Sequence, residues 1–162
     1  MDGGNESIDG GTPVVALEDL LVDFLNTLDV EYETDELTTP AELETWASAR
    51  GLMAGDLDDA RAVRTALRDL ASGLDVQPTG GSVTVGISGV GVGLAARTVS
   101  EAVLSAAVTL GIQGRLSRVK LCFAHDCALA FYDRSRNGSR TWCEMGVCGN
   151  RAKARSYRAR QQ

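Results

Sequence analysis

Four cysteines near the C-terminal end are the residues whose type and spacing could do chemistry: Cys122, Cys127, Cys143 and Cys148. They form two C-x4-C pairs of equal spacing, separated by fifteen residues. Tetrahedral Zn²⁺ takes four thiolates, commonly from two local pairs that lie on separate turns. Because four cysteine ligands leave no open coordination position, the pattern predicts a structural zinc ion rather than a catalytic one.

Two other states of the cysteines remain open. Two disulfide bonds would suit a secreted protein, but residues 1–12, MDGGNESIDGGT, lack the basic and apolar regions of a signal peptide. We expect those residues to be a disordered lead-in and the protein to be cytoplasmic, where thiols stay reduced. Unconnected buried cysteines are the third possibility. His125, the only histidine, could replace a cysteine as ligand, although we expect a loop residue beside the site.

Chemistry beyond metal binding has little support in the sequence. With a single histidine and no recognisable pair of nucleophile and base, we expect that the protein is not an enzyme. No stretch approaches the roughly 18–20 apolar residues of a membrane-spanning helix, so we expect no membrane partner.

The sequence divides into an acidic part and a basic part. The net charge is -6, but residues 1–114 contain 19 Asp and Glu against 5 Lys and Arg. Residues 115–162 contain 11 Lys and Arg against 3 Asp and Glu. Such a basic segment indicates a polyanionic partner. The alternative is that the two parts neutralise each other within the fold.

Hydrophobic periodicity predicts a helical domain over residues 13–114. Thr39 followed by Pro40 predicts a helix start, through a hydroxyl cap and a proline at the first helical position. Alternating Val and Ile residues predict a β-hairpin near 82–93. The expected fold class is therefore mainly α with a small β-hairpin (α+β). Amphipathic helices are expected at 15–28, 40–50, 57–72 and 97–111.

Residues 115–162 are expected to form a second module, too small to fold on an apolar core alone. Residues 128–132 alternate as a short strand, and the Asn-Gly pair at 137–138 is a strong two-residue turn signal. Trp142 is expected on the return strand, beside the third cysteine. This hairpin would bring the two cysteine pairs together over one metal ion.

The sequence after Cys148, GNRAKARSYRARQQ, predicts a basic helix over residues 151–160, and Asn150 can cap its start. Five cations without a carboxylate repel one another, and phosphate groups would neutralise them. The alternative is a solvated tail, or one that docks on the acidic domain. One helical stripe carries Arg151, Arg155 and Arg158, and a neighbouring stripe carries Lys153 and Arg160.

The segment CFAHDCALAFYDRSRNGSRTWCEMGVCGNRAKARSYRAR, which begins at Cys122, resembles the CGNR-type zinc finger. In a bacterial family of stress-induced transcription regulators, this finger follows a helical domain, to which LLVDFLNTL and WASARGL are similar. Ala128 and His125 depart from the aromatic residue and the proline that are common there. The resemblance implies zinc bound by the four cysteines, and DNA binding. It rests on Asp126-Cys127, Phe131, Asp133, SRNGSR at 135–140, Trp142-Cys143, Met145, CGNR at 148–151 and Tyr157-Arg158.

We therefore expect a zinc-dependent, DNA-binding transcription regulator. The acidic helical domain would repel DNA, and it is better suited to forming a homodimer or binding a small molecule. The alternative function is a zinc-stabilised protein-interaction module whose basic helix docks on an acidic partner. The expected DNA contacts are Arg134, Arg136 and Arg140 from the hairpin, and Arg151, Lys153, Arg155, Arg158 and Arg160 from the helix.

Overall fold

The computed structural model describes residues 16–161 except 75, 77–80, 90 and 125. The expected lead-in at 1–12 and the prediction for His125 therefore lie outside the described residues. Five helices and three two-stranded sheets make up the described part, which confirms the α+β class. None of these helices is long and apolar enough to cross a membrane.

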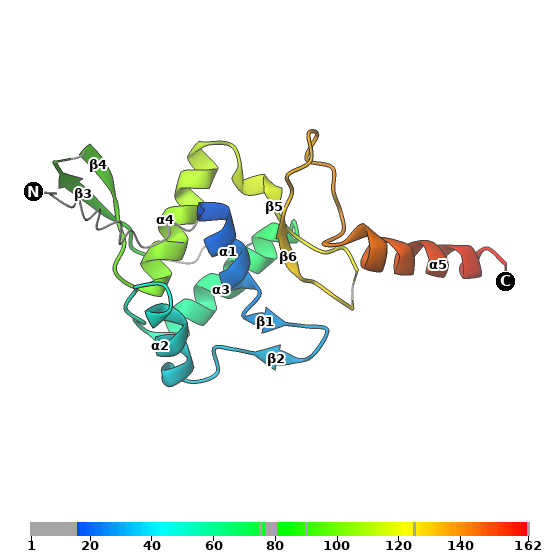
Figure 1. The fold of residues 1–162 in the computed structure, drawn as a ribbon, viewed down its shortest axis with the longest axis horizontal. Helices are drawn as coiled ribbons and strands as arrows, with labels where there is room; N and C mark the ends of the chain where they lie inside the picture. The colour runs from blue at the N-terminus through cyan, green and yellow to red at the C-terminus, as the bar shows by residue number, and fades with distance from the viewer. Residues whose placement is uncertain (1–15, 75, 77–80, 90, 125, 162) are drawn as a thin grey trace, which may run out of the picture.

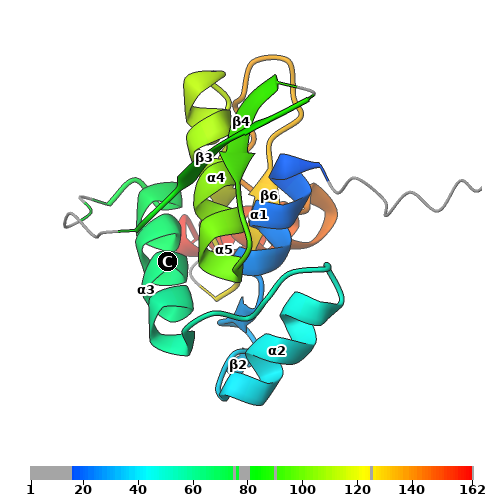
Figure 2. The same cartoon turned by 90° about the vertical axis from the view of Figure 1, so that its left-hand side faces the viewer.

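Four helices form the body of the molecule (Figure 1). Helices α1, α3 and α4 contact one another, and α2 lies beside them at one end (Figure 2). Their apolar faces meet in one core, in which Phe24 and Trp46 stack edge to face with ring centroids 5.6 Å apart. The helices are α1 (Leu17–Leu25), α2 (Pro40–Ser48), α3 (Leu57–Ala71) and α4 (Val99–Ile112).

Local hydrogen bonds explain where these helices begin. Thr39 caps α2 as expected: its Oγ1 accepts a bond from the Glu42 amide at 3.3 Å, and the Glu42 carboxylate accepts one from the Thr39 amide at 2.8 Å. Thr98 and Glu101 form the same reciprocal pair at the start of α4. Each pair satisfies amide groups that have no partner within the helix.

The first helix is shorter than predicted, because its expected last turn has other partners. Helix α1 ends at Leu25, and the side chain of the next residue, Asn26, bonds to the backbone of Ala130 instead. The chain then forms a small hairpin of β1 (Leu28–Asp29) and β2 (Thr34–Asp35), where we expected no strands. The β-hairpin expected near 82–93 is present as β3 (Thr84–Ser88) and β4 (Gly91–Ala95).

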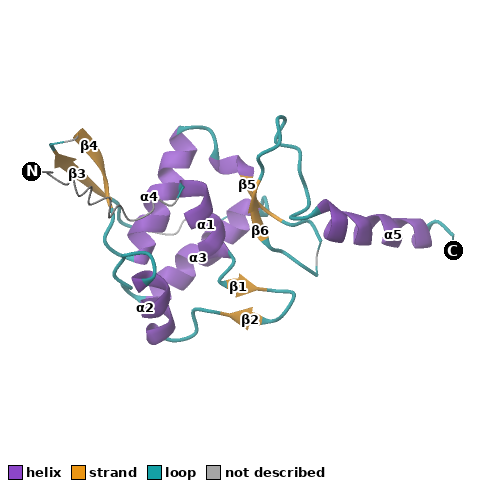
Figure 3. Ribbon diagram, viewed as in Figure 1, coloured by secondary structure: helices purple, strands orange, loops and turns teal. Residues whose placement is uncertain are grey.

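The C-terminal region contains two short strands and a helix that extends away from the body (Figure 3). The segment expected as a strand forms β6 (Ala130–Tyr132), but its partner is β5 (Val119–Leu121), which precedes the first cysteine. The predicted pairing with the chain after the Asn-Gly turn is therefore wrong. That returning chain lies against the other side of β5, where the Phe123 amide donates to the Thr141 carbonyl at 3.0 Å.

The buried apolar residues of the described part form two separate clusters. Val119 and Ala130, from β5 and β6, belong to the core that the helices build. The second cluster consists of Cys122, Ala124, Cys127 and Cys148, with Trp142 and Leu129 packed against it. The strands thus join the cysteine cluster to the helical body. The division into domains at residues 114 and 115 stays a prediction.

Candidate metal centre and cationic surface

The four cysteine sulfurs converge on one point from separate turns. All four Sγ atoms lie within 4.8 Å of one another. The Cys127 and Cys143 sulfurs are 3.7 Å apart, and those of Cys143 and Cys148 are 3.6 Å apart. Four thiolates at 2.3 Å from a tetrahedral zinc ion would lie about 3.8 Å from one another. The cluster therefore has the size of a zinc site, and the cysteines are free rather than disulfide-bonded.

Each cysteine pair spans a tight backbone turn. In the first turn, the amides of Cys127 and Ala128 both donate to the Ala124 carbonyl, and Ala128 adopts a positive φ of 50°. In the second, the amides of Cys148 and Gly149 donate to the Glu144 carbonyl. Turns of this kind direct two thiols to the same side of the chain, which the C-x4-C spacing alone did not reveal.

Gly149, directly after the last cysteine, lies close to two side chains. Residues Met145–Gly149 form a short π-helical turn that runs directly into α5 (Asn150–Ala159). A Cβ atom on Gly149 would collide with the Met145 side chain and would lie 3.4 Å from the Trp142 ring. The Trp142 ring in turn packs edge to face on Phe123, with centroids 5.8 Å apart. A larger residue at this position would therefore displace the flexible Met145 side chain, whereas its contact with Trp142 would be an ordinary one.

The thiols affect one another's ionisation. Burial raises the pKa of Cys148 to about 11, and burial together with the Cys122 sulfur raises the pKa of Cys143. Burial acts on Cys122 as well, but hydrogen bonds from the Cys143 and Ala124 amides outweigh it and lower the Cys122 pKa. Four thiolates in one place need a cation to neutralise them. A divalent metal ion supplies that charge and deprotonates the thiols that coordinate it.

Asp133 organises the loop between the cysteine pairs, a role that sequence reasoning did not assign. Its carboxylate is fully buried and accepts hydrogen bonds from the Lys120 ammonium at 2.8 Å and the Arg140 amide at 2.8 Å. The Ser135 amide donates to its other oxygen at 2.9 Å. Burial alone would raise the Asp133 pKa, but these donors outweigh it and hold the pKa well below its ordinary value. The loop is therefore closed around a buried charge.

Two side chains of the helical body bind the cysteine region, and sequence reasoning missed both. The Asn26 side chain pairs with the backbone of Ala130 in β6, accepting from its amide at 2.7 Å and donating to its carbonyl at 3.0 Å. The Arg68 guanidinium is buried and donates to the Ala128 carbonyl at 2.9 Å and the Leu25 carbonyl at 2.7 Å. An asparagine within a DFLNT segment could have suggested such a role.

Some of the cations that we predicted to contact DNA form ion pairs with carboxylates of the same chain. Arg134 pairs with Asp19 at 2.9 Å, and Arg151 pairs with Glu31 at 2.9 Å. Arg155 and Asp126 form a third pair at 3.1 Å. The two parts of the chain thus neutralise each other in some places, as the alternative interpretation expected.

The other cations that we predicted to contact DNA have different surroundings from these three arginines. Arg140 donates to the backbone carbonyls of Trp142 and Cys143, and its guanidinium lies over the Phe131 ring. Within the described part of the chain, no carboxylate pairs with the exposed residues Arg136, Lys153, Arg158 and Arg160.

The basic helix α5 projects from the molecule and buries none of its side chains (Figure 1). Asn150 does not cap it, because the preceding turn is already helical; its side chain donates instead to the Gly146 carbonyl at 3.0 Å. At about 100° per residue, Lys153 and Arg160 lie about 180° from the Arg151 stripe. The predicted neighbouring stripe is therefore on the opposite face.

This arrangement, four converging cysteines in a small module of strands and turns, defines the chain as a protein of the zinc-finger class. A family model described as "CGNR zinc finger" matches residues 118–161. A second, described as "Putative stress-induced transcription regulator", matches residues 18–115, more than half of the chain. The chain belongs to this regulator family, which confirms the resemblance seen in the sequence. No curated protein matches the chain.

Proposed function

We propose that this protein is a transcription regulator that binds DNA and depends on a structural zinc ion. The observation that carries the proposal is helix α5, which follows Cys148 closely, carries four cations with a fifth, Arg160, at its end, and has no buried side chain. An exposed helix of like charges is unfavourable alone, and DNA phosphates would neutralise it. Packing against a core does not explain α5, because none of its side chains is buried.

The zinc ion would be held by Cys122, Cys127, Cys143 and Cys148. When bound, it would neutralise the thiolates and hold the two turns together, so that metal binding and folding of this region are coupled. Four protein ligands leave no position for a substrate, and the role proposed for the metal is therefore structural. The second turn, at residues 144–149, would direct α5 away from the helical body.

The ion pairs divide the predicted DNA contacts into two sets. Arg151 and Arg155 face Glu31 and Asp126, so this side of α5 turns toward the β1–β2 hairpin. The loop over residues 133–142 rises on the other side of the molecule, away from that hairpin (Figures 1 and 2). Lys153 and Arg160, on the opposite face of α5, would then turn toward the side of the loop that carries Arg136.

We infer that this side of α5 and the loop form the DNA-binding face. Its primary cations are Arg136, Lys153 and Arg160, which have no carboxylate partner in the described part of the chain. Arg158 donates only to the Ala154 carbonyl of its own helix, but it lies on the Arg151 stripe and would therefore contribute less to this face. Arg134, Arg140, Arg151 and Arg155 would contribute less, because each has partners within the protein.

The helical body would serve regulation or assembly rather than DNA contact. Its β3–β4 hairpin exposes an apolar face, on which Val85 is paired with Leu94 and Ile87 with Val92. This face supports the proposal of a homodimer that forms through the helical part.

A second candidate function is supported by the ion pairs. Arg134, Arg151 and Arg155 already bind carboxylates, so the basic surface could equally accept an acidic protein partner. DNA binding predicts that affinity falls steeply with salt and differs between sequences, whereas a protein-interaction module predicts weak binding without sequence preference.

Selection from a pool of random DNA duplexes tests the proposal. The zinc-loaded protein is incubated with the pool at about 0.15 M salt, the physiological ionic strength, and the retained duplexes are sequenced. We expect an enriched motif that is lost in the Cys148→Ser variant. Retention without enrichment, or the same enrichment in the variant, would contradict a zinc-dependent, sequence-specific regulator and favour an acidic protein partner.

A further inference from the structure

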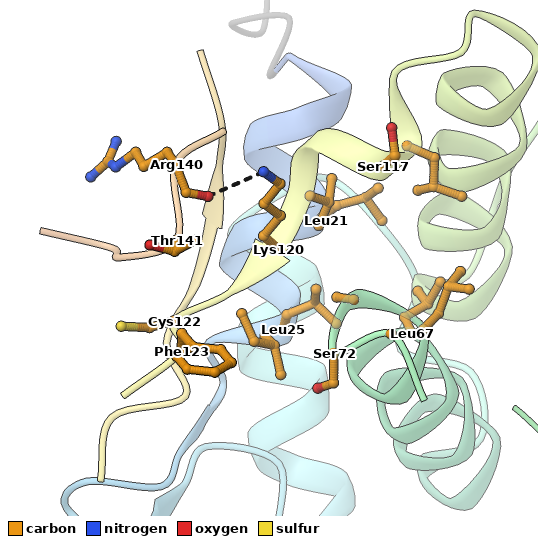
Figure 4. A pocket seen from close by; sticks show the side chains of 16 residues that line it. Leu21, Leu25, Leu67, Ser72, Ser117, Lys120, Cys122, Phe123, Arg140 and Thr141 are labelled. Atoms are coloured by element: carbon orange, nitrogen blue, oxygen red, sulfur yellow. Dashed lines mark hydrogen bonds between the residues drawn. The ribbon is translucent and has the colours of Figure 1, made fainter. Parts of the chain in front are cut away.

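A cavity of about 690 Å³ lies between the helical body and the cysteine region (Figure 4). One wall comes from α1 and the C-terminal end of α3. The opposite wall comes from β5, Phe123 and the returning chain at Arg140 and Thr141. Sites for small molecules typically occupy about 300–1,000 Å³ and often lie where two parts of a protein meet. The cavity has that size and that position.

The wall facing the cavity is mainly aliphatic. Leu67, Leu70 and Ala71 come from one face of α3, and Leu21 and Leu25 face them from α1. Such a surface favours an apolar ligand, since each Å² of apolar surface removed from water contributes about 25 cal/mol. The ligand would still need groups that match the few polar atoms at the edge.

The two cations beside the cavity already have partners. The Lys120 ammonium has three N–H donors and makes three hydrogen bonds, to the Asp133 carboxylate and to the carbonyls of Gly138 and Arg140. The Arg140 guanidinium points away from the leucines in Figure 4 and donates to backbone carbonyls. Neither cation is available to an anionic ligand, and no described carboxylate lines the cavity for a cationic one.

Hydroxyl groups are the polar atoms that remain. Ser117 and Thr141 line the cavity from opposite sides, and in Figure 4 their hydroxyl oxygens point away from the leucines, toward its edge. The Ser72 hydroxyl donates to the Arg68 carbonyl and can still accept a bond. A carbonyl or hydroxyl on the ligand would therefore meet these groups at the edge of the cavity, outside its aliphatic part.

We propose that this cavity binds an uncharged, mostly apolar small molecule that carries one or two hydroxyl or carbonyl groups. Its walls come from both matched segments: α1 and α3 lie in residues 18–115, and Val119–Phe123 and Thr141 lie in residues 118–161. The ligand would therefore contact α3 and β5, the strand directly before Cys122, at the same time. Control of DNA binding by this contact rests on the proposed function, whereas ligand binding itself does not.

Two dyes with the same aromatic scaffold test the proposal on the full-length, zinc-loaded protein. N-phenyl-1-naphthylamine is uncharged, and 8-anilinonaphthalene-1-sulfonate carries an added negative charge. We expect the uncharged dye to bind one site saturably, with a fluorescence increase, and the sulfonate to bind at least tenfold more weakly. Absence of saturable binding, or sulfonate binding of equal or greater affinity, would overturn the proposal.

A matched pair of variants locates the site. Leu70→Asp places a carboxylate in the cavity wall, and Val108→Asp places one on α4 outside it; the two side chains are 49% and 44% exposed. We expect Leu70→Asp to weaken binding of the uncharged dye at least tenfold and Val108→Asp to leave it unchanged. Equal effects of the two substitutions would overturn the assignment. The dye comparison on the unaltered chain decides the proposal even if Leu70→Asp fails to fold.

Discussion

The helical body and the cysteine region are held together by different interactions. The body buries leucine, valine and aromatic side chains from four helices, and side chains cap the starts of α2, α3 and α4. The cluster around the cysteines buries only Ala124 and three of the thiols, and the loop between the cysteine pairs closes around the Asp133 carboxylate. Apolar burial can stabilise the body without a metal, whereas thiols that close together need a cation.

The two regions also differ in what their charges face. Acidic residues of the body pair with Arg134 and Arg151, so part of the basic region's charge is neutralised within the molecule. The remaining cations of α5 and the loop face solvent. Charge counts from the sequence therefore overstate the cationic surface of the folded chain, because some of these cations already pair with carboxylates.

Zinc removal is expected to give the largest difference between the regions. Structural zinc contributes about 10–16 kcal/mol of apparent binding free energy in small fingers, so chelation should unfold the turns at 122–129 and 141–149. Hydrogen exchange measured by mass spectrometry should show protection lost there and kept in α1, α3 and α4. Equal loss in both regions would contradict independent stabilisation, and no loss would contradict the role of zinc.

Substitution of the solvent-facing cations should have the next largest effect. Replacing Arg136, Lys153 and Arg160 with Gln should lower the slope of log affinity against log salt by about three, since each phosphate contact contributes about 0.9. At 0.15 M salt this corresponds to about 100-fold weaker DNA binding. Fluorescence anisotropy over a salt series measures both quantities.

The cations that form ion pairs provide a matched control, because replacing three of them changes the net charge by the same amount. Replacing Arg134, Arg151 and Arg155 with Gln should lower the salt slope by less than half as much, because each already has a carboxylate partner. Equal slopes for the two triple variants would contradict the division into two sets.

The buried carboxylate of Asp133 should determine how the stability of the cysteine region changes as the pH falls. Asp133→Asn should reduce the free energy of unfolding at pH 7 by about 3 kcal/mol, because it leaves the Lys120 charge without its partner. The folded pKa of Asp133 is depressed, so its contribution is present above the ordinary carboxyl pKa and is lost as pH falls through the folded pKa.

Urea unfolding at several pH values tests this prediction. The loss of stability between pH 5 and acid should be shallower in Asp133→Asn than in the unaltered protein, whereas the exposed control Glu44→Gln should leave it unchanged. An unaltered acid profile in Asp133→Asn would show that this carboxylate is not responsible.

The smallest expected effect concerns the contact between the regions. Asn26→Ala removes both partners of the Ala130 backbone and should cost about 2 kcal/mol, the cost of leaving buried polar groups unsatisfied. Thermal unfolding of the zinc-loaded protein measures this loss, with the exposed Asn137→Ala as control. A change no larger than the control's would mean that β6 is held by apolar contacts alone.

The features that sequence reasoning predicted are those with local causes. The capped start of α2 depends on neighbouring residues, and the cysteine spacing is that of a common metal ligand set. Partners far apart in the chain were not predicted. Nothing near Ala130 indicates that its strand pairs with β5, or that Asn26 binds its backbone across 104 positions. The ion pairs of Arg134 and Arg151 depend on the same tertiary arrangement.

DNA binding with and without zinc tests the central claim most directly. A labelled duplex carrying the selected motif is titrated with zinc-loaded protein, with chelated protein, and with chelated protein after zinc is restored. We predict salt-dependent binding that is lost on chelation and regained with zinc, while the helical body keeps its far-UV circular dichroism. Chelated protein that binds the duplex with unchanged affinity and salt dependence would contradict a zinc-dependent DNA-binding regulator.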